Sequence, residues 1–379
     1  MDFAPSAAQE AVREVARRFA RERLAPLARD RDRHERFPAE EMRELGRLGL
    51  LGVNVPEELG GSAAGPVAYV LAMAEIAAAD ASVAVTMAVT NMCAELIARA
   101  GTPAQRRRYV PPLVSGEFLA GAFALSEPQS GSDASAMTTF AERRGDRYVL
   151  NGAKQWITSG AYAGVMVVWA RTSREPGSGG ISCFLVERGT PGLTVGRPED
   201  KMGLRGSNTV PLAFEECEIP AKNRLGEEGS GFRWAMTALD GGRIGIAAQA
   251  LGIGEAALAA AVRYAKERHA FGRPIAEFQG VSFPLADVAT ELAAARLLAL
   301  RAAWCKEEGR PCTREAAIAK VFASEAANRA VTRAVQVHGG YGYTDAFPVE
   351  RYLRDARVTM IYEGTSEIQR LVIARELLR

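Results

Sequence analysis

The chain has 379 residues, of which 47 are Lys or Arg and 45 are Asp or Glu, so its formal net charge is +2. This near-balance argues against a nucleic-acid-coating surface, which needs a concentrated basic field. Hydrophobic residues make up 48% and charged residues 24%, as in ordinary globular proteins, and the length suits two or three domains or one large multi-layer unit.

No segment is predicted to span a membrane. The most apolar run, 77–94, contains Asp80 and several small polar residues, which favour a buried helix. The N-terminus lacks the apolar core of a signal peptide, and its acidic residues argue against a mitochondrial transit peptide, so we expect a cytoplasmic protein. Five Cys without a CxxC pair and three widely separated His indicate neither a disulfide framework nor a metal site.

Residues 1–117 are predicted to form an N-terminal helical domain. Apolar residues recur there every three or four positions, as in amphipathic helices. A loop rich in Gly and Pro covers 55–66, and an Ala-rich buried helix follows over about 66–80. Thr102 and Pro103 indicate the start of another helix, as its N-cap and its first helical residue.

The pattern of residues changes twice after this domain. Residues 118–228 contain short β-rich runs that follow one another without intervening helices, which predicts a central antiparallel β-barrel or sandwich. Residues 229–379 are again helical, with long segments over 240–268, about 280–307 and about 313–338, and a helix bundle is expected. The predicted fold class is therefore α+β, in the order helical domain, β-domain, helical bundle.

Three short segments are candidates for chemistry, and each also has a purely structural interpretation. ALSEPQSGSD (124–133) suits a loop around a polar cofactor or an ordinary surface turn. KQWITSG (154–160) places an aromatic face beside a hydroxyl, as a flat ring requires, or forms a half-buried strand. In IYEGTSEIQR (361–370), Glu363 follows bulky apolar residues. Such surroundings raise the pKa of a carboxylate and make it a competent base, unless the segment is a helix cap with a solvated Glu.

One stretch of the sequence also matches the glycine pattern of a nicotinamide-dinucleotide-binding motif. Gly252 to Ala257 matches the loose GxGxxA pattern, but this stretch lies inside a helical segment. Dinucleotide binding needs a strand immediately before the first glycine. Small residues for close helix packing explain the match better.

Further matches extend these segments, namely ERHAFGRPI (267–275), FQGV (278–281) and QVHGGYGYT (336–344). In order and spacing the chain resembles the acyl-CoA dehydrogenase family from end to end, most of all its short- and branched-chain bacterial members. The resemblance implies a C-terminal four-helix bundle and FAD held between β-domain and bundle. It also implies a homotetramer that desaturates an acyl-CoA to the trans-2-enoyl-CoA and passes electrons to an electron-transfer flavoprotein.

The resemblance further implies roles for individual residues. Glu363 would remove the α-proton while the β-hydrogen leaves as hydride to flavin N5; some members carry the base at the position of Gly242, and Asp240 is a rival base. Predicted flavin contacts are Phe123, Leu125, Ser126, Trp156, Ile157, Thr158, Thr365 and Glu367. Predicted contacts to the diphosphate and adenosine part, across a subunit interface, are Arg268, Phe271, Gln279, Gln336, Gly339 and Gly340. Predicted substrate contacts are Ser132, Asp240, Arg243 and Gly364.

The chain departs from the family pattern in two places. Gln129-Ser130 replaces a common Gly-Ala or Gly-Asn pair, and 90–101, which should line part of the acyl pocket, lacks an SL…PI pattern. Acyl chain length therefore stays open. Three alternatives also stay open: a flavin oxidase or monooxygenase that uses O₂, a non-catalytic acyl-CoA-binding protein, and a dehydrogenase for acyl groups on a carrier protein.

Overall fold

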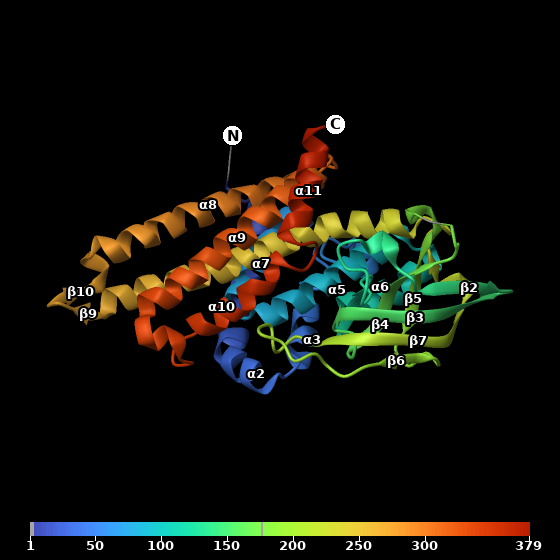
Figure 1. Cartoon of the computed structure of the whole chain (residues 1–379), viewed down its shortest axis with the longest axis horizontal. Coiled ribbons are helices and arrows are strands. Elements are labelled where there is room, and N and C mark those ends of the chain that lie inside the picture. The colour runs from blue at the N-terminus through green and yellow to red at the C-terminus, as the bar shows by residue number, and fades with distance from the viewer. Residues whose placement is uncertain (1–3, 176) are drawn as a thin grey trace.

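The computed structural model describes residues 4–175 and 177–379. The predicted chain order of helices, sheet and helices is confirmed, and the sheet lies at one end of a long helical body (Figure 1). The first part comprises α1 (Ala7–Phe19), α2 (Ala28–His34), α3 (Ala39–Arg47), α4 (Gly65–Ala79), α5 (Ala81–Ala100) and α6 (Pro103–Val114).

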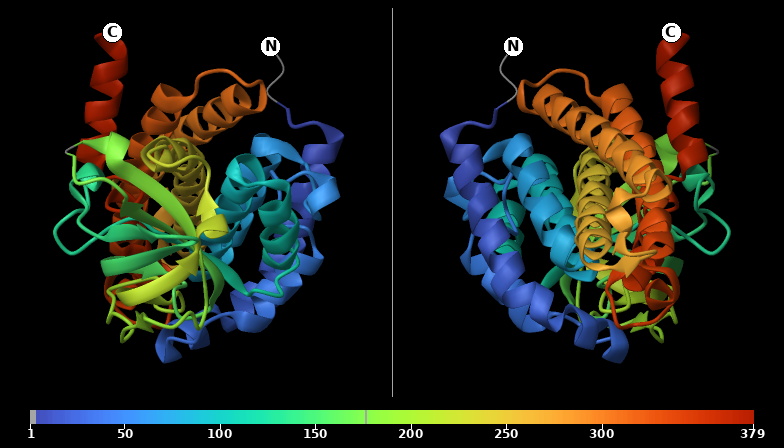
Figure 2. Two further views of the ribbon diagram at one scale, coloured as in Figure 1. Left: turned by 90° about the vertical axis from the view of Figure 1, so that its right-hand side faces the viewer. Right: turned by 90° about the vertical axis from the view of Figure 1, so that its left-hand side faces the viewer.

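The central sheet and the bundle follow. The sheet contains β1 (Ala120–Ala124), β2 (Phe140–Arg144), β3 (Arg147–Thr158), β4 (Ala163–Arg171), β5 (Ile181–Glu187), β6 (Leu193–Val195), β7 (Thr209–Pro220) and β8 (Arg224–Leu225). The last part comprises α7 (Gly231–Glu267), the hairpin β9 (His269–Ala270) and β10 (Arg273–Pro274), α8 (Gln279–Glu307), α9 (Thr313–His338), α10 (Val349–Arg357) and α11 (Ser366–Leu377). End views show the N-terminal helices packed along one side of the bundle (Figure 2).

Helix starts follow the local signals in the sequence. The Thr102 side chain accepts a hydrogen bond from the Gln105 N–H, and Gln105 Oε1 accepts one from the Thr102 N–H at 2.8 Å. This reciprocal capping box begins α6 as predicted. Asp80 separates α4 from α5 and caps α5 by accepting from the N–H groups of Ser82 and Val83.

The sheet is mixed, which corrects the prediction of a wholly antiparallel one. Its order is β6-β7-β3-β2-β4-β5-β8, and β1 pairs in parallel with β4. The antiparallel hairpin of β2 and β3 lies between β1 and β4 in the chain. This inserted hairpin makes the connection long enough for β4 to run in the same direction as β1, which a tight turn cannot do.

Helix α7 begins at Gly231 rather than near residue 240, and it passes through Gly241 and Gly242 without a break. Two adjacent glycines disfavour a helix by about 1 kcal/mol each relative to alanine. Close packing accounts for Gly242, because a Cβ there would lie 2.3 Å from Glu363 Oε2 and 3.1 Å from Met92 Sδ, whereas one on Gly241 would meet only the end of the Lys306 side chain, at 2.8 Å. Tertiary contacts therefore outweigh local propensity in this helix.

Two helices, α5 and α7, are long and apolar enough to cross a membrane by length and composition. From the sequence, only the region of α5 was expected to come near this limit. In the structure 94% of the most apolar window of α5 and 78% of that of α7 are buried inside the protein. Their place in the core therefore accounts for their composition.

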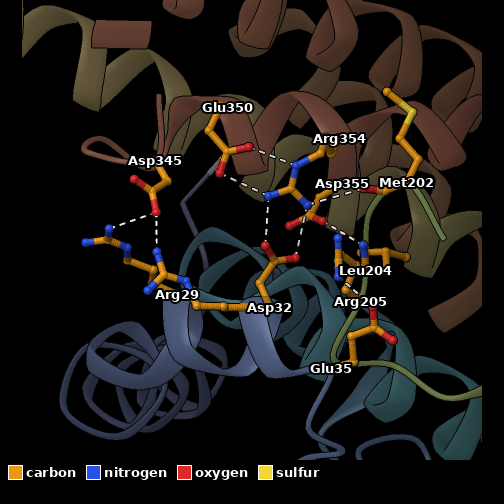
Figure 3. Close-up of polar contacts among 11 residues, drawn as sticks. Arg29, Asp32, Glu35, Met202, Leu204, Arg205, Asp345, Glu350, Arg354 and Asp355 are labelled. Atoms are coloured by element: carbon orange, nitrogen blue, oxygen red, sulfur yellow. Dashed lines mark hydrogen bonds and ion pairs between the residues drawn. The ribbon is translucent and has the colours of Figure 1, made fainter. Parts of the chain in front are cut away.

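The three parts of the chain meet at a polar junction around α10 (Figure 3). Arg354 of α10 pairs with Asp32 of α2 at 2.7 Å. The next residue, Asp355, accepts a hydrogen bond of 2.6 Å from the N–H of Leu204, in the loop before β7. Because α10 leads directly into the segment 358–365, this junction sets where the Glu363 loop begins.

Candidate active site

Glu363 lies in the loop between α10 and α11, and its backbone is left-handed. Its φ is 53°, and that of the next residue, Gly364, is 85°. A non-glycine residue keeps this conformation only where its surroundings hold it. Gln369 Nε2 donates to the carbonyl oxygens of Glu363 at 3.1 Å and Gly364 at 2.8 Å, and Lys320 Nζ donates to that of Gly364 at 2.7 Å.

The Glu363 carboxylate lies against α7 at Gly242. Its Oε2 atom is buried and has no hydrogen-bond partner within the described part of the chain. Burial raises the pKa of Glu363 to about 7, although the cations of Arg243 and Lys320 act to lower it. A buried carboxylate with a free oxygen and a pKa near neutrality can accept a proton from a bound molecule.

The capping interpretation of this segment applies to its neighbours. Thr365 caps α11, because its hydroxyl accepts a hydrogen bond of 3.3 Å from the Ile368 N–H. Glu367 is exposed in the first turn of α11, where a carboxylate complements the helix dipole. The segment therefore contains both a helix cap and, two residues before it, the buried Glu363.

The other two positions considered for the base occupy the same stretch of α7. A side chain on Gly242 would collide with Glu363 Oε2, so only one of these positions can hold a carboxylate. Asp240 Oδ1 accepts from Arg243 at 2.7 Å, and its Oδ2 accepts from Thr313 at 2.7 Å. Both Asp240 oxygens are thus engaged, in contrast to the free Oε2 of Glu363.

The loop after β1 and the end of β3 lie side by side, as two of the candidate segments require. The Gln155 N–H donates to the Ser126 carbonyl at 2.9 Å, and Lys154 Nζ donates to the Leu125 carbonyl at 3.1 Å. Lys154 also pairs with buried Glu127 at 2.8 Å. Burial acts to raise the pKa of Glu127, but Lys154 and neighbouring donors hold it at about 2.

Side chains in these two segments point in different directions. Trp156 is 61% exposed and has φ 63°, Ile157 is buried in the sheet core, and Thr158 is half-buried. Phe123 and Leu125 pack into a cluster with α5 and α7. Of the predicted flavin contacts, the side chains of Ile157, Phe123 and Leu125 are therefore occupied in the core, which leaves their backbone groups for a ligand.

The remaining predicted FAD contacts lie at the far end of the bundle, around the β9–β10 hairpin (Figure 1). All of them are exposed, and Phe271 is 95% exposed: Arg268, Phe271, Gln279, Gln336, Gly339 and Gly340. Gly242 and Arg268 are separated by about 39 Å of helix at 1.5 Å per residue. Within one chain the structure does not bring these residues to Glu363.

The segment 90–101 contributes five residues to the lining of a pocket between α5 and α7: Asn91, Met92, Glu95, Leu96 and Arg99. Gly242 lies at its wall, and the ion pair between Glu95 and Lys306, at 2.7 Å, lies at its polar side. Ser132, predicted to face the substrate, is exposed in the loop after β1.

Sequence reasoning did not single out four polar residues that organise this site. Glu127 and Lys154 belong to the candidate segments 124–133 and 154–160, but the sequence does not show that these two charged residues are buried. Lys320 falls in the buried stripe of α9 with Ala316, Ala319 and Ala323, so a charged residue on an apolar stripe was the available signal. Gln369, also fully buried, had no comparable signal.

Comparisons with known proteins match the whole chain. Three family models cover it: the acyl-CoA dehydrogenase N-terminal domain over residues 6–117, the middle domain over 122–217 and the C-terminal domain over 229–378. A curated acyl-CoA dehydrogenase of Bacillus subtilis is 50% identical over 98% of each chain.

Solved structures match as closely. Butyryl-CoA dehydrogenase from Megasphaera elsdenii is 47% identical, with a TM-score of 0.98 over all of both chains. A chain described with the electron transferring flavoprotein of Acidaminococcus fermentans is 46% identical, also with a TM-score of 0.98 over both chains. The chain therefore belongs to the acyl-CoA dehydrogenase family of FAD-dependent oxidoreductases.

Proposed function

We propose that the protein desaturates the Cα–Cβ bond of a short- or branched-chain acyl-CoA, with Glu363 as the base. The observation that carries this proposal is the free, buried Oε2 of Glu363 against Gly242, with a pKa near neutrality. The Cα–H bond breaks and its proton passes to Glu363, while the hydrogen on Cβ leaves with its electron pair. The product is the trans-2-enoyl-CoA.

The residues around Trp156 fit FAD, which supplies the acceptor for the hydride when it is bound. The exposed indole offers a flat apolar face, and Thr158 next to it offers a hydroxyl. The hydroxyls of Ser159, next to Thr158, and of Ser366, three residues after Glu363, are buried without a hydrogen-bond partner among the described residues. Buried polar groups of this kind call for a partner, and a cofactor with many polar atoms supplies one.

The far end of the cofactor requires a second copy of the chain. Because Arg268 and Phe271 lie about 39 Å of helix away from Gly242, they would contact FAD held by a neighbouring subunit. The Arg268 guanidinium, with its planar fork of donors, suits a diphosphate. At least a dimer follows, and we propose the homotetramer that is general in the family. Gel filtration that shows a monomer with FAD retained would contradict this assembly.

Several observations support a short acyl group. Tyr362, next to Glu363, donates its hydroxyl hydrogen bond to Gln249 of α7, and Gln249 in turn donates to the Ala81 carbonyl at 2.9 Å. These two polar side chains, of which Gln249 is fully buried, occupy the space between the Glu363 loop and α7, so a long alkyl chain could enter there only by displacing them and leaving their polar atoms unpaired. The similarity to butyryl-CoA dehydrogenase agrees with this size.

The electron acceptor is proposed from similarity alone. The related chain from Acidaminococcus fermentans is described together with an electron transferring flavoprotein. We propose that such a flavoprotein reoxidises the enzyme, in the cytoplasm, rather than O₂.

Anaerobic titration of the purified FAD-loaded enzyme tests the proposal. Butyryl-, isobutyryl-, 2-methylbutyryl-, isovaleryl-, hexanoyl- and octanoyl-CoA are added in turn, and bleaching of the oxidised flavin band is followed. Fast bleaching by a short or branched subset is expected. Absence of bleaching by every thioester, with dithionite still reducing the flavin, would overturn the proposal and favour oxidase or monooxygenase chemistry.

A further inference from the structure

Lys320 is a fully buried lysine on α9 that has no carboxylate partner among the described residues. Its ammonium donates instead to the carbonyl oxygen of Gly364, at 2.7 Å. Burial lowers the pKa of Lys320 to about 8, while the charge of Glu363 acts to raise it. The side chain is therefore still mostly protonated at neutral pH.

The other buried lysine near the site shows what is unusual about Lys320. Lys154 is equally inaccessible, but it forms an ion pair of 2.8 Å with Glu127. The charge of Lys154 is thus neutralised by a direct neighbour. The ammonium of Lys320 donates to a neutral carbonyl, and its charge acts on the carboxylate of Glu363, whose pKa it lowers.

The carbonyl that Lys320 holds belongs to the strained part of the loop. Glu363 and Gly364 both have positive φ, and Gln369 is the other side-chain donor to the Gly364 carbonyl, besides bonding that of Glu363. A glutamate keeps a left-handed backbone only where its surroundings hold it, so the loop relaxes when its donors are removed. Relaxation at these two residues would carry the Glu363 carboxylate away from Gly242.

We propose that Lys320 is a positioning residue for the base, through both its hydrogen bond and its charge. The hydrogen bond to Gly364 keeps the Glu363 carboxylate against Gly242, and the positive charge favours the ionised carboxylate that can accept a proton. The inference rests on the proposed function for the role of Glu363 as base.

The other groups that face Glu363 are accounted for. Tyr69 of α4, Cys93 of α5 and Tyr362 of the same loop have pKa values raised by burial, so that they are neutral at physiological pH. Arg243 of α7 is a second cation, whose charge lowers the pKa of Glu363 more than that of Lys320 does, and it is paired with Asp240 at 2.7 Å. Lys320 is consequently the cation near Glu363 whose charge no carboxylate contacts directly in the described chain.

Two substitutions separate charge from hydrogen bonding. Lys320→Met removes both, and Lys320→Gln removes the charge but keeps a donor for the Gly364 carbonyl. A nearby opposite charge lowers the pKa of a carboxyl by about 1–3 units, so both variants should raise the pKa of Glu363 by about one unit or more. At pH values below the pKa of Glu363, each unit by which that pKa rises should lower the rate of flavin reduction about tenfold. Only Lys320→Met should also lower the rate at its high-pH plateau.

The matched control is Ser324→Ala. Ser324 is equally buried one turn further along α9, and its hydroxyl bonds the Val321 carbonyl of its own helix. This variant should keep the wild-type midpoint and plateau. Circular dichroism of each variant establishes that it is folded, and Lys320→Gln carries the test if Lys320→Met does not fold.

The Glu363 carboxyl band in the infrared spectrum, assigned by its loss in Glu363→Gln, is titrated in each FAD-loaded variant. The pH profile of flavin reduction by butyryl-CoA is measured in parallel. Lysine variants that titrate with the Ser324→Ala midpoint would overturn the role of Lys320. If no thioester reduces the wild-type flavin, the proposed function fails, and the infrared titration still decides whether Lys320 controls Glu363.

Discussion

The two ends of the long helix α7 carry two parts of the candidate site, and these differ in how many of their contacts a single chain supplies. At Gly242, Glu363 lies against α7, and Lys320 of α9 and Gln369 of α11 hold the carbonyls of its loop. Around Arg268 and Phe271, the predicted cofactor contacts are exposed and reach no other part of the same chain. The comparison teaches that one chain can complete the proton-accepting half of the site, whereas its hold on the distal half of FAD depends on a neighbour.

Of the changes at either end of α7, removal of the Glu363 carboxylate should have the largest effect on activity. Glu363→Gln should slow flavin reduction by butyryl-CoA by about 10²–10⁴-fold or more, because general-base catalysis contributes that much. FAD content should stay unchanged, since the distal contacts are untouched. Stopped-flow absorbance measures the rate, with Glu376→Gln on α11 as control. A rate within a few-fold of wild type would remove Glu363 from the role of base.

Crowding of the Glu363 end should be the next largest effect. A methyl group in Gly242→Ala would occupy the position of Glu363 Oε2 and push the carboxylate from α7. Misplacement by about 1 Å can cost about 10²-fold, so we expect a loss of that order in flavin reduction. Gly179→Ala is the control, because a Cβ there meets no atom within 4 Å. Equal rates in the two variants would show that the contact with Gly242 is unimportant.

A change at the far end should affect cofactor retention rather than chemistry. Arg268→Gln removes a charged donor, and charge-assisted hydrogen bonds contribute about 1.5–3 kcal/mol, which is more than tenfold in affinity. FAD release, followed by flavin fluorescence on dilution, should increase accordingly, while the reduction rate per bound flavin stays near wild type. Lys266→Gln, also exposed near the end of α7, serves as control. Unchanged FAD affinity would contradict the proposed subunit-bridging cofactor.

The smallest effect is expected at the junction that supports the Glu363 loop. Burial raises the pKa of Asp355 to about 7. The folded state therefore binds this proton more tightly than the unfolded state, and the contribution of Asp355 to stability declines as pH rises from about 4 to 7. Asp355→Asn keeps the acceptor for the Leu204 N–H and should flatten this decline. Denaturant unfolding at pH 5 and pH 7.5 measures it; an unchanged slope would contradict a buried, protonatable Asp355.

Much of the fold was predictable because its signals are local. The N-caps Thr102 and Thr365 act within three residues of themselves, and the alternation of helical and strand periodicity marks the three parts of the chain. The prediction of a wholly antiparallel sheet was wrong, because β1 pairs in parallel with β4. This pairing joins two strands that are separated in the chain by an entire hairpin, and no local sequence pattern indicates which distant strand is the partner.

The candidate site was predictable in part for the same reason. Motif order identified Glu363, Trp156 and Arg268 as residues of one family pattern, although their roles stay predictions. The resemblance already implied that Arg268 acts across a subunit interface, and the structure adds its separation from Gly242, by about 39 Å of helix. The sequence did not indicate Lys320, because an isolated lysine in an Ala-rich helix is most often solvent-exposed.

Local signals and motif order were enough to predict the three-part order, the starts of α4 and α6 and the acidic residue in the last loop, because these depend on neighbours within a turn or on the order of motifs. Only the tertiary structure decided that Gly241 and Gly242 remain helical, that Glu363 adopts a left-handed backbone and that a buried Lys320 holds its loop. Each of these features is locally unfavourable. Each persists because contacts between distant segments outweigh the local cost.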